Sequence, residues 1–320
     1  MKNDNNNAAY GAHLVPFSGI PTFMRRPAQR DLTGVDIAML GIPFDSGTSY
    51  RSGTRFGPRG IREASLLLWG VNTVMDVTPL KVLNVVDYGD VEVIPVDIIA
   101  SMKAIETEVK SVLGKDVMVG VMGGDHSISL PVLRSHADKY GALSVIHLDA
   151  HPDTWHAEFG NHLYSHGTPF RRATEEGLID TDAYIQIGIR GPVSDPSDLE
   201  NARGLGAKIY PIGKCFEIGI PALIESIHAV VGSRPVYISL DIDATDPAFA
   251  PGTGTPEVGG FSSYQMLQIV RGLLGLNLVG FDLVEVSPPY DHSGITSILA
   301  ANLIFEMLSL IALKRISAKQ

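Results

Sequence analysis

Short apolar runs rich in β-branched residues recur along this chain and alternate with segments of helical period. Eight of these runs predict strands, at 35–44, 82–88, 117–122, 143–148, 183–189, 207–212, 235–240 and 278–284. Segments with the helical period lie between several of them, at 97–113, 128–139, 220–231 and 262–274. Strands that are hydrophobic throughout and alternate with helices are typical of a mainly parallel sheet covered on both faces. The predicted fold is therefore α/β, with three αβα layers around a sheet of about eight strands.

The alternation continues to the C-terminus without a Pro/Gly/Ser-rich linker, a repeat period or a low-complexity tract. We therefore predict one domain at 35–320. The preceding residues, 1–34, are predicted to form an N-terminal extension that packs on the core or on a neighbouring subunit. The longest apolar stretch, at 295–313, is interrupted by Asn302 and Glu306, and this pattern predicts an amphipathic closing helix.

Charge and cysteine content restrict the expected partners and location. The chain has 25 Lys and Arg against 35 Asp and Glu, a formal net charge of −10, and no basic cluster that could follow a phosphate backbone. Nucleic acid is therefore not an expected partner. Cys215 is the single cysteine, so no disulfide can form within the chain, and we expect a cytoplasmic location. The polar N-terminus has no signal-peptide pattern, and no membrane partner is expected.

Carboxylates and histidines stand where four predicted strands end. The positions are Asp125 and His126 after 117–122, Asp149, His151 and Asp153 after 143–148, Asp241 and Asp243 after 235–240, and Glu285 after 278–284. Ligands of open parallel sheets bind beyond the carboxyl ends of the strands. Alternate residues of an extended segment face the same way, so the Asp149–His151–Asp153 triple is expected to aim at one point. Asp241 and Asp243 are paired by the same geometry.

Crowded carboxylates of this kind predict bound cations. Four Asp side chains close together repel one another and raise their own pKa values unless a cation neutralises them. Two divalent metal ions balance four negative charges. Carboxylate and imidazole ligands without thiolates suit Mn²⁺ first, with Ni²⁺ and Zn²⁺ as alternatives. Two such ions roughly 3.5–4 Å apart can hold a bridging hydroxide, the nucleophile of a metal-assisted hydrolysis.

In order and context, the segments that carry these residues resemble the signature segments of the ureohydrolase superfamily, the arginases and agmatinases. They are GGDHS at 123–127, DAHPD at 149–153, HGTPF at 166–170, SLDIDATDPAFAPGTGTPEVGG at 239–260 and DLVEVSPPYD at 282–291. The resemblance extends from GIPFDSGTSYRSGTRFGPRGIR at 41–62 to the C-terminus, and FSGIPTFMRRP at 17–27 is similar to the agmatinase-like branch. It implies an arginase-like fold, a single ureohydrolase catalytic domain and assembly into homotrimers or homohexamers.

The resemblance also implies a ligand set. One metal would be held by His126, Asp149, Asp153 and Asp241, and the other by Asp149, His151, Asp241 and Asp243, with Asp149 and Asp241 bridging. All six residues are present, which favours an active enzyme.

Two further residues fall at functional positions of the family. His166 is at the position of its proton-shuttling histidine, and Glu285 is at the position of the carboxylate that binds the substrate guanidinium. The alternatives are a solvated loop histidine and a structural salt bridge. Asp125 faces away from His126 by alternation, so we predict that it orients a ligand by hydrogen bonding.

Trp155 argues against arginine as the substrate. The resemblance implies an asparagine at this position in arginases, where it meets the α-carboxylate of arginine. An indole offers one donor and a large apolar surface, so an α-amino acid would lose a partner. Ordinary loop packing is the alternative role for Trp155.

The loop at 154–165 is expected to line the substrate pocket, with Trp155, His162 and Tyr164 as substrate-binding residues. Glu158 in this loop could meet the terminal ammonium of agmatine. Three basic residues, Arg51, Arg55 and Arg62, could instead meet the carboxylate of a guanidino acid.

The predicted function is hydrolysis of a guanidino C–N bond to urea and an amine, with agmatine as the leading substrate. The alternatives are 4-guanidinobutyrate, 3-guanidinopropionate, guanidine itself and a small substituted guanidine or biguanide. Two other hypotheses are a catalytically silent subunit that pairs with an active relative, and an acyl-amide hydrolase related to the histone deacetylases. The last uses one metal, so metal stoichiometry separates it from a ureohydrolase.

Overall fold

One eight-stranded sheet organises the protein, in a computed structural model that describes residues 15–318. Its strands are β1 (Ile37–Gly41), β2 (Val85–Asp90), β3 (Met118–Met122), β4 (Leu143–Leu148), β5 (Ile179–Ile187), β6 (Lys208–Tyr210), β7 (Pro235–Asp241) and β8 (Asn277–Val284). Their order is β2-β1-β3-β8-β7-β4-β5-β6, and every neighbouring pair is parallel. The predicted parallel α/β sheet of eight strands is confirmed.

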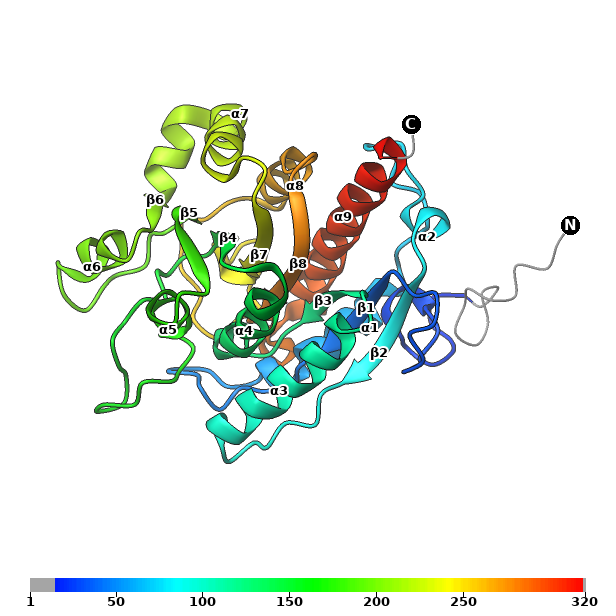
Figure 1. Cartoon of the computed structure of the whole chain (residues 1–320), viewed down its shortest axis with the longest axis horizontal. Helices are drawn as coiled ribbons and strands as arrows, with labels where there is room; N and C mark the ends of the chain where they lie inside the picture. Colours follow the sequence, from blue (N-terminus) through cyan, green and yellow to red (C-terminus); the bar gives the residue numbers. More distant parts are fainter. Residues whose placement is uncertain (1–14, 319–320) are drawn as a thin grey trace, which may run out of the picture.

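Helices cover both faces of the sheet (Figure 1). They are α1 (Gly57–Ser65), α2 (Pro79–Val82), α3 (Ile98–Leu113), α4 (Ser129–Tyr140), α5 (Pro169–Glu175), α6 (Asp198–Gly204), α7 (Ile212–Val231), α8 (Ser263–Gly272) and α9 (Ile295–Ser317). The helix pairs α1–α9, α8–α9 and α7–α8 pack in one layer, and α3–α4 and α4–α5 pack in the other. Alternate residues of β1 enter opposite cores, with Met39 in one hydrophobic cluster and Leu40 in the other. The three predicted layers are therefore present.

Local capping residues explain where two predicted helices begin. Asp97 accepts a hydrogen bond from the Ala100 N–H at 2.9 Å at the start of α3. Ser262 and Gln265 form a reciprocal capping box at the start of α8. α7 begins at Ile212, well before the predicted 220, and its backbone breaks at Gly219 with φ of +77°.

The prediction of an amphipathic closing helix is wrong. In α9 every residue from Leu303 to Leu310 is buried, because the helix lies among α1, α2, α8 and the sheet. Its polar Glu306 is satisfied inside the protein by Arg271 at 2.5 Å and Asn72 at 2.8 Å. The segment His292–Ser317 is long and apolar enough by composition to cross a membrane, but 78% of its most apolar window is buried within the protein, as in a core helix.

The described part of the N-terminal extension packs on the core. Phe23 and Met24 are buried, and their N–H groups donate to Asp87 Oδ2 and Ser65 Oγ, each at 2.8 Å. The first fourteen residues of the predicted extension lie outside the described residues, and the division of the chain at 34 stays a prediction.

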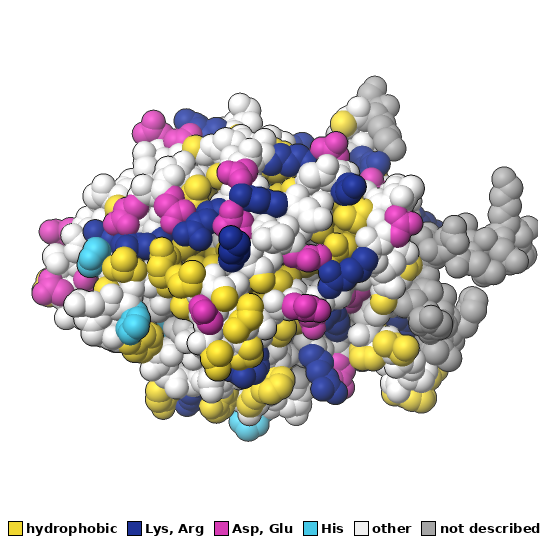
Figure 2. Space-filling view, turned by 60° about the horizontal axis from the view of Figure 1, so that its bottom comes forward, with side chains coloured by type: hydrophobic (Ala, Val, Ile, Leu, Met, Phe, Trp, Pro, Cys, Tyr) yellow, Lys and Arg dark blue, Asp and Glu magenta, His cyan; other side chains and the backbone are white. Residues whose placement is uncertain are grey.

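The surface view in Figure 2 shows hydrophobic side chains grouped in the middle of one face, with acidic and basic side chains around them.

The four central strands of the sheet, in the order β3, β8, β7 and β4, are those whose ends carry the candidate functional residues. Their carboxyl ends meet at one edge, where the side chains that follow them are brought together.

Candidate functional site

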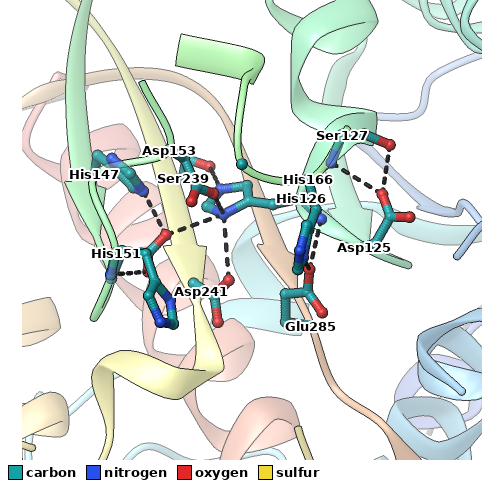
Figure 3. A network of polar contacts seen from close by, with 12 residues as sticks. Asp125, His126, Ser127, His147, His151, Asp153, His166, Ser239, Asp241 and Glu285 are labelled. Carbon is teal, nitrogen blue, oxygen red and sulfur yellow. Dashed lines mark hydrogen bonds and ion pairs between the residues drawn. The ribbon is translucent and has the colours of Figure 1, made fainter. Parts of the chain in front are cut away.

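His126, which follows β3, lies at the centre of the first group of candidate ligands. Its Nδ1 lies 3.1 Å from Asp149 Oδ2, 3.0 Å from Asp153 Oδ2 and 3.2 Å from Asp241 Oδ2. All four side chains are buried. In Figure 3 the dashed lines from His126 run to the carboxylates around it. No residue in 15–318 forms a properly oriented hydrogen bond with this Nδ1.

His151 forms the second group with Asp149 and Asp243. Its Nδ1 lies 3.1 Å from Asp243 Oδ2 and 3.5 Å from Asp149 Oδ1. Asp149 therefore turns one carboxylate oxygen toward each histidine, as a bridging ligand would. Asp241 is placed beside His126, and its Oδ1 accepts the Asp243 N–H at 2.8 Å. The structure thus brings all six predicted ligands into two adjoining clusters.

The charges of these clusters fit divalent cations. Within the described residues, none of the four Asp side chains is paired with a Lys or Arg. Burial, reinforced by the neighbouring carboxylates, raises the pKa of Asp241 well above its ordinary value and that of Asp153 to about 7. Burial alone would lower the pKa of His126, but the surrounding carboxylates raise it well above its ordinary value. Such a cluster retains protons that a metal ion would displace.

Ser239 sets the tautomer of His126, and the sequence analysis missed it. The Ser239 hydroxyl donates to Asp282 Oδ1 at 2.7 Å and lies 2.9 Å from His126 Nε2. Because its hydrogen is already used, Ser239 accepts from the Nε2–H of His126. When a metal ion displaces the proton from Nδ1, the lone pair left on that nitrogen faces the carboxylate cluster, as a metal ligand requires.

His147 supports Asp149 in a similar way, and it was also missed. The Gln186 amide lies 3.2 Å from His147 Nδ1, and His147 Nε2 lies 2.7 Å from Asp149 Oδ2. Burial lowers the pKa of His147 to about 4, so the ring is neutral and donates one hydrogen to Asp149. His147 and Ser239 each stand two residues before a candidate ligand. Extending the alternation rule backwards along β4 and β7 would have found both.

His166 and Glu285 form a buried pair beside the clusters (Figure 3). His166 Nδ1 lies 3.0 Å from Glu285 Oε1, and its Nε2 lies 2.8 Å from Ser49 Oγ. Burial alone would lower the pKa of His166, but Glu285 and nearby carboxylates raise it to about 9. The Ser49 N–H donates to Nε2 at 3.0 Å, which favours the neutral ring and opposes this rise.

We expect His166 in the metal-free protein to titrate near pH 9, above its ordinary value of 6.5. Folding then favours the imidazolium, so this contribution to stability is complete below pH 6.5 and is lost as the pH rises through about 9. An NMR pH titration of the ring measures the midpoint. Glu285→Gln should lower it, and a midpoint at or below 6.5 in the unaltered protein would contradict the pairing. Divalent cations bound nearby should also lower it, since they repel the imidazolium.

Glu285 keeps one carboxylate oxygen without a partner. Its Oε1 accepts from the His126 backbone N–H at 3.0 Å and contacts His166, whereas no described residue bonds to its buried Oε2. The backbone of Glu285 has φ of +64°, a conformation that costs a non-glycine residue about 1–3 kcal/mol. An unsatisfied buried oxygen on a residue with a strained backbone is typical of a group that binds a ligand.

The prediction that Asp125 orients a metal ligand by hydrogen bonding is wrong. Its carboxylate accepts from the Gly47 N–H at 2.8 Å and from the backbone and hydroxyl of Ser127, and it touches no side chain of a candidate metal ligand. Asp125 instead fixes the segment that carries Ser49, the hydroxyl partner of His166.

A cavity of about 380 Å³ opens over the clusters. Its lining residues are Ser49, His151, Asp153, Trp155, Ala157, Glu158, Phe159, His166, Gly167, Pro192, Ser194, Asp241 and Thr255. Trp155 therefore lies where a substrate pocket was predicted. His162 is exposed and Tyr164 packs against the hydrophobic core, so these two predicted pocket residues do not line the cavity.

None of the three predicted arginine candidates lines the cavity. Arg62 is buried against Asp87, with two contacts at 2.8 and 2.9 Å, and Arg55 is paired with Asp45. The Arg51 guanidinium lies over the rings of Tyr50 and Tyr290, 5.2 and 5.0 Å from their centroids. These contacts assign Arg55 and Arg62 structural roles.

The three-layer parallel sheet and the metal-fitting cluster at its carboxyl edge define the class as an α/β protein with a candidate binuclear metal centre. Comparison with known proteins gives the family, because the sequence model of the Arginase family matches residues 35–309. The chain belongs to the Arginase family, whose members are binuclear-metal-dependent hydrolases that act on C–N bonds.

Proteins similar in sequence or in structure align with nearly the whole chain. Guanidinopropionase of Pseudomonas aeruginosa is 44% identical over 312 residues, 98% of each chain. A mitochondrial agmatinase of Gallus gallus is 43% identical over 290 residues, 91% of this chain and 85% of its own. Among solved structures, proclavaminate amidino hydrolase from Streptomyces clavuligerus aligns with a TM-score of 0.89 at 44% identity, covering 93% of this chain and 98% of its own.

Proposed function

We propose that this protein is an amidinohydrolase that cleaves the guanidino C–N bond of a small guanidino compound into urea and an amine, with agmatine, which yields putrescine, as the leading substrate. One observation carries the proposal. The partnerless buried oxygen of Glu285 stands beside a cluster of four carboxylates and two imidazoles that fits two divalent cations. A guanidinium is planar and cationic, so its N–H groups suit such a carboxylate.

The metal ligands proposed are the six residues of the two clusters, His126, Asp149, His151, Asp153, Asp241 and Asp243. We propose Mn²⁺ as the metal, with Ni²⁺ as the alternative, because the donors are carboxylates and imidazoles without thiolates. When bound, the two cations would activate a water molecule as nucleophile and withdraw charge from the reacting carbon. Ser239 and His147 keep the ligands His126 and Asp149 in the orientation that this requires.

The protein groups around the clusters would bind and protonate the substrate. Glu285 holds the guanidinium through Oε2 and fixes its central carbon over the clusters. His166, paired with Glu285 and raised in pKa, holds a proton that it would pass to the nitrogen of the departing amine. Ser49 contacts Nε2 of His166 and would reload or orient this ring.

The cavity lining favours a substrate tail without a carboxylate. Of the acidic residues in the lining, Asp153 and Asp241 are proposed metal ligands, so Glu158 is the one whose charge the metals would not balance, and the lining contains no Lys or Arg. A guanidino acid would bring its carboxylate near Glu158 without a Lys or Arg partner in the lining, which costs free energy. This supports agmatine over 4-guanidinobutyrate and 3-guanidinopropionate, although similar relatives are named guanidinobutyrase and guanidinopropionase. Guanidine and small substituted guanidines or biguanides also lack the carboxylate and remain the second candidates.

A urea-release assay with metal-loaded protein tests the function. We expect urea from agmatine or from a carboxylate-free guanidine or biguanide, and a kcat/KM at least tenfold lower for 4-guanidinobutyrate, 3-guanidinopropionate and arginine. The reason is that the carboxylate of these compounds has no cationic partner in the pocket. A free-energy cost of about 1.4 kcal/mol is enough for a tenfold loss. Parallel loading with Mn²⁺ and Ni²⁺ compares the metals. Absence of urea from the whole panel with both metals would refute the proposed reaction.

Assembly and location complete the proposal. We propose a homotrimer or homohexamer in the cytoplasm, supported by the family membership and by the single buried cysteine. Light scattering of the purified protein measures the assembly, and cell fractionation measures the location.

A further inference from the structure

The indole of Trp155 has its only donor occupied. Trp155 Nε1 donates to Asp198 Oδ2 at 2.9 Å, and the same oxygen accepts the N–H groups of Ser194 and Asp195, each at 3.0 Å. The other side of the indole packs against Gly167, where a β-carbon would lie only 2.8 Å from the ring. Trp155 is thus held in place from two sides, and what it offers the cavity is carbon surface.

Glu158 adds a negative charge to the same wall of the cavity. Its Oε2 accepts from Ser165 Oγ at 2.5 Å and from the Gly167 N–H at 3.3 Å. No Lys or Arg among residues 15–318 is paired with Glu158, and no hydrogen bond from a described residue occupies its Oε1, because both of its side-chain hydrogen bonds are to Oε2. The carboxylate therefore keeps a free oxygen and an uncompensated charge, and it bonds to Ser165 and Gly167, the two residues that flank His166.

We propose that Trp155 and Glu158 form a tail subsite that takes a short substrate tail ending in a cationic nitrogen, and that Asp198 is the positioning residue of this subsite. This inference rests on the proposed amidinohydrolase function and names the class of its substrate. The aromatic carbon surface and the adjacent carboxylate together suit an aminoalkyl or amidino cation, which gains an ion pair and a cation–π contact. A carboxylate tail meets Glu158 as a like charge, and the indole N–H that could have bound it is already used.

The size of the cavity limits the length of the substrate tail. The Glu158 carboxylate bonds to the backbone at Gly167, directly after the histidine that is paired with Glu285. Glu158 and His166 both line the same cavity of about 380 Å³, so a tail held by Glu158 would be short.

Substitution of Glu158 by Gln tests the charge. An amide oxygen can still accept from Ser165 and Gly167, so the loop should be retained while the charge is lost. For Glu158→Gln we expect KM for agmatine to rise about tenfold or more with kcat nearly unchanged, and KM for 1-butylguanidine, which lacks the cationic end, to stay as in wild type. Glu200→Gln, at an exposed position on α6, is the matched control and should change neither value. Equal changes in KM for agmatine and for 1-butylguanidine in the Glu158→Gln variant would overturn the subsite.

Two variants of Asp198 test the positioning role. Asp198→Ala removes the partner of Trp155 and should raise KM for agmatine and 1-butylguanidine alike, with kcat nearly unchanged. Asp198→Asn retains an acceptor and should restore KM. Failure of Asp198→Ala to change KM would overturn the positioning role.

Binding of 1,4-diaminobutane separates this inference from the proposed reaction. The diamine carries the cationic tail without a guanidino carbon, so calorimetry with the metal-loaded protein gives an answer even if no compound is hydrolysed. We expect about tenfold weaker binding to Glu158→Gln than to wild type. Equal affinity, or no binding to wild type, would overturn the subsite whether or not urea is released from the panel.

Discussion

Asp149→Asn is expected to abolish both metal binding and turnover while the fold is retained. Asp149 turns one carboxylate oxygen toward His126 and the other toward His151, so it connects the two groups of candidate ligands. An amide of the same shape has no charge and only one acceptor oxygen. Loss of metal assistance removes several kcal/mol of barrier lowering, so we expect kcat/KM to fall about 10³-fold or more.

Metal analysis by mass spectrometry and the urea assay measure this result together. Wild type should carry two divalent ions per chain, as the family does, and Asp149→Asn should carry fewer than one. Circular dichroism should remain that of the folded protein, because the substitution removes a buried charge without changing volume. Asp116→Asn is the control, since its side chain is 94% exposed and pairs only with Lys139 among the described residues. Wild-type metal content and turnover in Asp149→Asn would refute the ligand assignment.

Glu285→Gln is expected to lower kcat/KM by about 10²- to 10⁴-fold with metal content unchanged. The variant keeps an amide oxygen for the His126 N–H but loses the charge that would pair with the guanidinium. Removing one partner of a buried charged pair typically costs about 3–5 kcal/mol, which corresponds to this loss of rate. Steady-state kinetics with the best substrate of the panel gives the number.

Two outcomes would contradict this role for Glu285. Unchanged kcat/KM would mean that the residue only forms a structural pair with His166, and loss of metal would place it among the ligands. Glu285→Asp retains the charge on a shorter side chain, so part of the lost activity should return. No such recovery is expected if the side chain served only to fill space.

Local patterns account for what could be predicted from the sequence. A buried parallel strand is apolar on both faces, so each of the eight strands is visible in the chain without its neighbours. The period-two alternation predicted that Asp149, His151 and Asp153 face one region, and the structure places them in adjoining clusters. The same rule applied to Asp125 gave the correct direction, away from His126, but not its partners Gly47 and Ser127.

Long-range contacts account for the features that could not be predicted from the sequence. α9 is polar at Asn302 and Glu306, which suggests a solvent-facing stripe, but Arg271 and Asn72 satisfy Glu306 inside the protein. The partners of Trp155 and Glu158 follow from how their loop folds back on itself and against the segment that leads into α6. His162 and Tyr164, in the same loop as Trp155, do not line the cavity, because His162 is exposed and Tyr164 packs against the core.

The sequence by itself determined the class of fold, the chemical nature of the candidate ligands and the strand ends at which they stand, because these depend on residue type and on periodicity over a few positions. Only the tertiary structure decided that β3, β8, β7 and β4 are neighbours, so that candidate ligands from distant parts of the chain meet. It also decided that Ser239 bonds to Nε2 of His126, which turns Nδ1 toward the carboxylates, and that Asp198 occupies the Trp155 N–H. Strand order and hydrogen-bond partners arise from contacts between residues far apart in the chain, and no local pattern encodes them.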